Sequence, residues 1–62
     1  MKNWISYTLK NDGYAIKKTA EHETELPRKD AELEMMFYKN NKDYEEHFLL
    51  KPFNALQYTF TK

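Results

Sequence analysis

The sequence predicts a small α+β domain in which one helix is packed on one face of a small antiparallel sheet. Three observations carry this prediction. Asp12-Gly13 lies between two runs of β-prone residues, which is a strong signal for a β-hairpin. A run of mostly strong helix formers follows Pro27, and a clear alternation of apolar and polar residues ends the chain. With 62 residues, the chain is expected to form one domain over residues 1–62, with a small core.

The N-terminal hairpin is predicted to turn at Asp12-Gly13, because a type I′ turn needs positive φ at both central positions and these residues tolerate it. A two-residue loop pairs Leu9 with Ile16, whereas a three-residue loop over residues 11–13 pairs Leu9 with Ala15. The two-residue loop gathers the apolar side chains on one face, so we expect that register. The predicted core face of the hairpin carries Ile5, Tyr7, Leu9, Tyr14, Ile16 and Ala20.

The helix is predicted over about residues 27–39. Residues 21–25 before it offer nothing to bury and are expected to form a solvated connection. Pro27 suits the first helical turn, because its missing N–H would have no intrahelical partner there. At helical spacing, four apolar side chains form one stripe that should face the sheet. These are Leu26, Leu33, Met36 and Phe37.

Two further segments are predicted as a C-terminal strand or hairpin. Residues 44–50 fit a short helix capped by Asp43, with Glu46 three residues on, or a strand that turns through residues 51–54, and the strand is expected. The last strand alternates, with Leu56, Tyr58 and Phe60 on its apolar side. Because the residues of the predicted helix also alternate in part, an all-β five-stranded meander or small barrel is the alternative fold.

The second face of the predicted sheet carries hydroxyl groups and lysines, and Trp4 shares its parity with them. Tryptophan is enriched among binding hot spots, so Trp4 is a candidate partner contact. Together with Lys10 and Lys17 it could also bind nucleic acid, because lysines neutralise phosphates and an aromatic ring stacks on a base. A nucleic-acid-binding sheet is therefore one alternative function.

The charge of the chain is unevenly distributed. The formal net charge is zero, but residues 21–46 hold nine acidic side chains against four basic ones. An acidic surface favours a partner of complementary charge. Glu32 and Glu34 on the predicted helix, and Tyr38 near its end, are therefore candidate partner contacts.

The inventory of reactive residues does not predict an enzyme. The chain has no cysteine, which excludes disulfides and Cys-based zinc sites and fits a cytoplasmic protein. His22 and His47 lack the spacing of a helical metal pair, and no glycine-rich phosphate loop or nucleophile elbow occurs, so neither metal nor cofactor is expected. No run approaches the roughly 18 apolar residues of a membrane span, and the N-terminus lacks an apolar signal segment, so no membrane partner is expected.

These features predict a small non-enzymatic protein-interaction module. Nine lysines against one arginine, with five asparagines, are typical of A+T-rich coding sequences, as in phages, plasmids and low-G+C bacteria. The leading hypothesis is a phage or mobile-element inhibitor or regulator that binds a larger host protein. The alternatives are a nucleic-acid-binding sheet, using Trp4 and lysines, and a structural or homo-oligomeric component. The candidate partner-binding residues are Trp4, Lys10, Lys17, Glu32, Glu34 and Tyr38.

Overall fold

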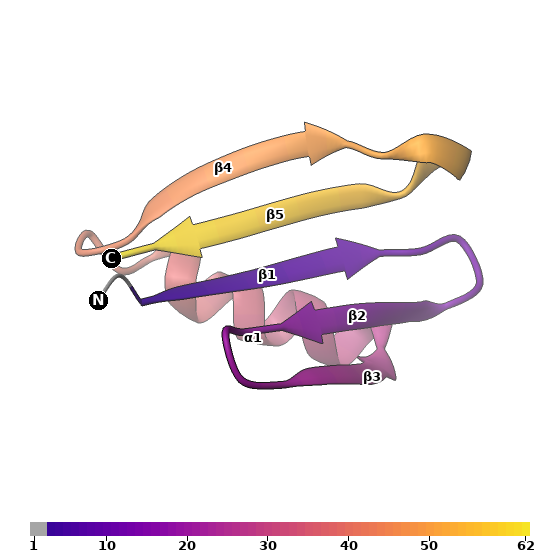
Figure 1. The fold of residues 1–62 in the computed structure, drawn as a ribbon, viewed down its shortest axis with the longest axis horizontal. Helices are drawn as coiled ribbons and strands as arrows, with labels where there is room; N and C mark the ends of the chain where they lie inside the picture. Colours follow the sequence, from indigo (N-terminus) through magenta and orange to yellow (C-terminus); the bar gives the residue numbers. More distant parts are fainter. Residues whose placement is uncertain (1–2) are drawn as a thin grey trace.

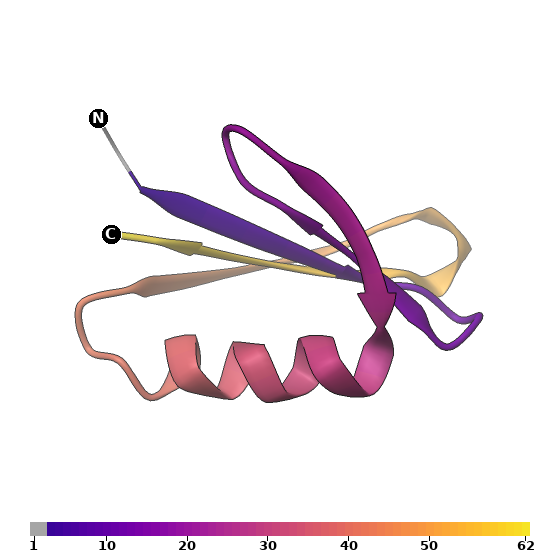
Figure 2. The ribbon, with the colours of Figure 1, turned by 90° about the horizontal axis from the view of Figure 1, so that it is seen from below.

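The computed structural model describes residues 3–62 and confirms the α+β prediction. Five antiparallel strands form one sheet in the order β3-β2-β1-β5-β4 (Figure 1). The strands are β1 (Trp4–Leu9), β2 (Tyr14–Lys18), β3 (Glu23–Pro27), β4 (Glu45–Leu50) and β5 (Leu56–Thr61). Helix α1 (Arg28–Lys39) lies along one side of the sheet, and no other described element covers the opposite side (Figure 2).

The β1–β2 hairpin turns where the sequence predicts, but its register differs. Leu9 pairs with Ala15, so the loop has three residues, 11–13, and the predicted two-residue register is wrong. Gly13 has a φ of 87°, and the Lys10 amide donates to the Tyr14 carbonyl over 3.0 Å. A turn closed by a left-handed glycine uses the Asp-Gly pair equally well. The sequence signal therefore marks the turn without choosing between the two loop lengths.

The observed register places different side chains of β2 in the core. Ala15 is fully buried beneath the helix, whereas Tyr14 and Ile16 lie on the opposite face of the sheet. Ala20 lies beyond the end of β2 and is exposed. The small Ala15 side chain lets the helix approach β2 closely, which compensates for losing Ile16 from the core.

Strand β3 occupies much of the segment predicted as a solvated connection. Most of its side chains are exposed, so the residues carry little apolar pattern. Leu26 is the exception: it pairs with Ala15 and packs against the core. An edge strand is held by hydrogen bonds to the backbone of the neighbouring strand. Its side chains can therefore be polar, without the alternating apolar pattern that predicts a strand. Pro27 then ends β3 and leads directly into α1.

Helix α1 spans residues 28–39, close to the predicted range, but it turns a different face to the sheet. Ala31 and Met35 are buried and Tyr38 is half-buried, whereas Leu33 and Phe37 are 68% and 65% exposed. The predicted stripe is therefore wrong. The helix is apolar on two sides, and the side with the small Ala31 permits the closer approach to the sheet.

The core lies between α1 and the strands β1, β2 and β5. Seven hydrophobic side chains are buried: Ile5, Tyr7, Leu9, Ala15, Ala31, Met35 and Phe60. Tyr38 anchors the end of the helix in an aromatic cluster, with ring centroids 5.0 Å from Tyr44, 5.6 Å from Phe60 and 6.3 Å from Tyr7. These contacts fix the helix in position and with it the side chains that point away from the core.

The C-terminal hairpin confirms the strand prediction for residues 44–50. Phe48 pairs with Tyr58 and Leu50 with Leu56, while β4 forms an edge of the sheet. A 3-10 turn, η1 (Pro52–Asn54), connects the two strands. Its central residue, Phe53, is 93% exposed and has a φ of 61°.

Candidate functional site

Helix α1 covers only part of its face of the sheet. Its backbone lies closest to β1, β2 and β3, and its last turn reaches β5 through Tyr38 and Phe60. On the same side, β5 is half-buried at Leu56 and Tyr58, and β4 is exposed along its whole length. The open strip is two strands wide, about 10 Å at the usual strand spacing. A groove of about 300 Å3 runs between α1 and the strands β1 and β5, beside this strip. Its lining comes from both sides: Leu9, Arg28, Glu32, Met35, Met36, Lys39, Leu56 and Tyr58.

The floor of this strip is apolar. Leu56 and Tyr58 share a face with the core residues of β1, because each lies directly opposite one of them. Phe48 and Leu50 extend the same face onto β4, where they are 54% and 65% exposed. The rings of Phe48 and Tyr58 pack with centroids 5.1 Å apart. The sheet thus carries hydrophobic side chains beyond the edge of the helix that covers it.

The helix adds three exposed apolar side chains on the same side of the molecule. Met36 borders the groove and is 57% exposed, while Leu33 and Phe37 lie one turn apart on the side of α1 away from the sheet. We call Leu33, Met36, Phe37, Phe48 and Leu50 the apolar surface. Each exposes on the order of 100 Å2, so together they expose roughly 500 Å2. Patches of this size are typical of interaction sites.

Charged side chains border the apolar surface. In the groove, Arg28 Nε lies 3.3 Å from Glu32 Oε2, and Lys39 Nζ lies 4.7 Å from the centre of the Tyr58 ring. Lys29, on the first turn of α1, is also exposed. The surface therefore combines an apolar centre with a polar rim, which is the usual anatomy of a protein interface.

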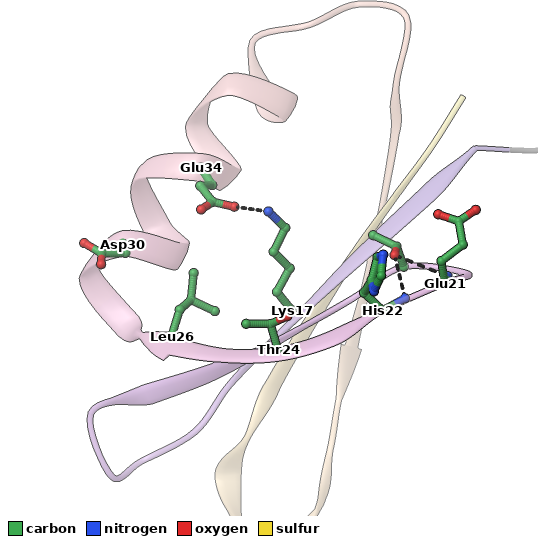
Figure 3. Close-up of a pocket in the computed structure, with 8 residues that line it drawn as sticks. Lys17, Glu21, His22, Thr24, Leu26, Asp30 and Glu34 are labelled. Carbon is green, nitrogen blue, oxygen red and sulfur yellow. Dashed lines mark hydrogen bonds and ion pairs between the residues drawn. The ribbon is translucent and has the colours of Figure 1, made fainter.

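A second cleft, of about 660 Å3, lies on the other flank of α1 (Figure 3). Lys17 extends from β2 and places Nζ 2.8 Å from Glu34 Oε1, while the Tyr7 hydroxyl donates to the same oxygen over 2.7 Å. Leu26 supplies an apolar wall, and Asp30 points away from Lys17. His22 and Glu21 lie at the far end, by the β2–β3 turn, where the Thr19 hydroxyl caps the backbone.

The pKa shifts in this cleft describe a structural network. Partial burial alone would raise the pKa of Glu34, but the hydrogen bonds from Lys17 and Tyr7 outweigh it and lower the pKa. Burial, aided by the Glu34 carboxylate, raises the pKa of Tyr7 well above its usual range. Glu34 is thus held as an anion and Tyr7 as a neutral phenol. These are the states that hold α1 on the sheet, not those of an acid–base pair poised near neutral pH.

The predicted contact residues do not form one site. Trp4 is half-buried at the start of β1, and Lys10 follows the other end of that strand, roughly 20 Å away at the rise of an extended chain. Lys10 pairs with Glu25 at 2.7 Å and with Asp12 at 3.5 Å, and the hydrogen bond to Glu25 raises the pKa of Lys10.

The other predicted residues are engaged within the chain. Lys17 and Glu34 pair with each other, Glu32 pairs with Arg28, and Tyr38 belongs to the aromatic cluster. Lys17 lies on the helix side of the sheet, opposite to Trp4, so the predicted face shared by Trp4, Lys10 and Lys17 is wrong for Lys17 and holds for Trp4 and Lys10. That face instead carries Lys18, together with the acids Glu23, Glu25 and Glu45.

Sequence reasoning missed the apolar surface because it assigned Leu33, Met36 and Phe37 to the core. Two signals could have revealed it. The helix is apolar on two sides, and a single sheet can bury only one of them. The run Phe48-Leu49-Leu50 is apolar on both faces of a strand at the edge of the sheet.

Comparisons with protein-family models, with curated proteins and with solved structures find no match, so function must be inferred from the fold and its surfaces. Within residues 3–62, no group of three or more His, Asp or Glu side chains is placed to hold a metal ion. No helix in the same range is long and apolar enough to cross a bilayer.

Proposed function

We propose that the protein is a non-enzymatic protein-docking module whose contact site is the apolar surface. The observation that carries this proposal is the exposure of Leu33, Met36, Phe37, Phe48 and Leu50 on the helix side of the sheet, where Met36 lines the groove. Water contact with this much hydrophobic area is unfavourable, and a docked protein would remove it. The polar rim would set the orientation of that partner.

The role of an inhibitor or regulator from a phage or mobile element, acting on a larger host protein in the cytoplasm, belongs to the same proposal. It is supported by the size of the chain and by its lysine-rich and asparagine-rich composition, and it does not depend on which protein covers the apolar surface. A small rigid domain can occupy a partner's surface without any chemistry of its own.

Site-specific photocrosslinking in the native host tests the docking proposal. A benzophenone amino acid replaces Phe37, and a matched variant carries it at Tyr14, an exposed aromatic residue on the opposite face of the sheet. We expect a protein adduct from position 37 and little or none from position 14. Equal yields from the two positions, or no adduct from position 37, would refute the proposal.

A further inference from the structure

We infer that the occupant of the apolar surface is a second copy of this chain, whose α1 lies in the groove of the first. This inference rests on the docking proposal and names its partner. Two strands span about 10 Å, and packed helices lie 8–10 Å apart, so the open strip over β5 and β4 accommodates one helix. The chain itself offers a helix with an apolar side still exposed.

In such a dimer, one side of α1 would contact the helix of the other copy, and another side would contact the sheet of the other copy. At 100° per residue, Met35 points to its own sheet, Met36 points toward the groove, and Leu33 and Phe37 point away from the sheet. If each α1 lies in the other copy's groove, its Leu33 and Phe37 reach the partner's Phe48 and Leu50. The exposed apolar side chains of α1 and those of β4 are then buried against each other in the same dimer.

The placement of each α1 in the groove of the other copy gives the dimer two-fold symmetry. The two helices form one layer between two outer sheets, and the two-fold axis runs between the helices and parallel to them. Met36 of each copy, on the groove side of α1, then meets Met36 of the other near the axis. The interface is isologous and closed, so assembly stops at a dimer.

Charge complementarity favours this occupant. Lys29 and Glu32 point to the groove side of α1, on either side of the direction of Met36. Because the two-fold axis runs parallel to the helices, the two copies of α1 point in the same direction. Glu32 of one copy then faces Lys29 of the other, with an offset of about one helical turn along the axis. The symmetry forms this ion pair twice. The formal net charge of zero means that two copies do not repel each other as whole molecules.

The buried area also fits a dimer. The apolar surface contributes roughly 500 Å2 per copy, and the groove lining with its charged rim adds to it. Stable interfaces bury about 800 Å2 on each partner. With the groove lining and the charged rim, the area that each copy would bury approaches this standard size.

Sedimentation equilibrium of the purified chain, with two designed variants, tests the inference. We expect a species of twice the 7.6 kDa chain mass. Phe37→Glu, at a side chain exposed in the single copy, should weaken dimerisation about a hundredfold while leaving the circular dichroism spectrum unchanged. A monomer at about 1 mM, or a dimer unaffected by Phe37→Glu, would overturn the inference.

Cysteine crosslinking tests the position of the axis, because the chain has no cysteine of its own. Met36→Cys should form a disulfide-linked dimer on mild oxidation, and Lys18→Cys, exposed on the opposite face, should not. Equal crosslinking of the two variants would contradict the arrangement.

A charge swap tests the parallel orientation of the helices. Lys29→Glu and Glu32→Lys should each weaken the dimer about tenfold, and the double variant should restore it. A merely structural role for either side chain would not produce this rescue, and a double variant weaker than both single variants would contradict the parallel pairing.

The outcomes separate the inference from the proposal on which it rests. A monomeric chain that still gives a heavier, heterologous adduct from position 37 in the native host overturns the second-copy inference and leaves the docking proposal intact. A monomeric chain with no adduct overturns both. An adduct of twice the chain mass supports both.

Discussion

The Tyr7 hydroxyl donates a hydrogen bond to Glu34 Oε1 over 2.7 Å, and this contact joins the central strand β1 to helix α1. Lys17 approaches the same oxygen to 2.8 Å from β2. One carboxylate therefore ties the helix to two neighbouring strands. The position of α1 determines which part of the sheet stays open, so this network also determines where the apolar surface lies.

We predict that Glu34→Gln lowers the free energy of unfolding by about 1 kcal/mol at pH 7, because the exposure of the pair to solvent limits its strength. The folded pKa of Glu34 is depressed, so its ionised form stabilises the fold above the unfolded pKa, near 4.5. This stability is lost as the pH falls through the folded pKa. Urea denaturation from pH 7 to pH 3 should show the difference between variant and wild type shrinking toward zero.

Glu32→Gln is the matched control for that measurement. Its carboxylate pairs with Arg28 one turn away on the same helix and is mostly in contact with water. At a concentration below self-association, we expect a change within about 0.5 kcal/mol at pH 7. A loss as large as that of Glu34→Gln would mean that the contacts of Glu34 with Tyr7 and Lys17 stabilise the fold no more than an exposed ion pair does.

Alkaline unfolding should report on Tyr7. Its pKa is raised in the folded state by burial and by Glu34, whereas the unfolded chain ionises it near pH 10. The unfolded state therefore loses a proton that the folded state keeps, and stability falls as the pH rises above 10. The Tyr7→Phe variant should be less stable at pH 7 and should lose less further stability between pH 9 and pH 11, as measured by urea denaturation. Equal alkaline losses in both proteins would contradict the assignment.

Two neighbouring methionines test the face that α1 turns to the sheet. Met35 is 3% exposed, so Met35→Ala should cost about 3 kcal/mol through lost contacts and the cavity that remains. Met36→Ala should change the stability of the single chain by less than about 0.5 kcal/mol. Thermal unfolding at a concentration below self-association compares the two variants. A larger loss of stability for Met36→Ala than for Met35→Ala would support the helix face predicted from the sequence instead.

Gly13 tests the three-residue loop of the β1–β2 hairpin. Its φ of 87° is favourable for glycine, and no atom lies within 4 Å of where a Cβ would stand. Gly13→Ala should therefore destabilise the fold by about 1 kcal/mol through backbone strain alone. Gly13→Asn should cost less, because asparagine tolerates this conformation better. Similar losses for both in urea denaturation would point to a different turn.

The sequence predicts the elements of this fold better than their faces. The hairpin turn, α1 and the last strand each follow from local signals in Asp12-Gly13, the run after Pro27 and the alternation from Leu56. The register of β2 and the rotation of α1 depend instead on how closely two elements approach. That approach is decided by small side chains, Ala15 and Ala31, which carry little weight in a hydrophobic pattern.

The contact residues predicted from the sequence show the same limit. Glu34 and Tyr38 are polar or aromatic residues on a surface helix, and both are engaged in holding that helix to the sheet. Leu33 and Phe37 are apolar, and both are exposed. Residue type alone does not distinguish a helix face that packs on its own sheet from one that stays exposed to solvent.

The most direct test of the docked second copy is the adduct formed by a benzophenone at position 37 in the native host, identified by its mass and by its site of attachment. We expect an adduct of twice the chain mass, attached on β4 or β5 of the second copy near Phe48, Leu50 or Tyr58. An absent adduct, or one formed equally from position 14, would contradict it.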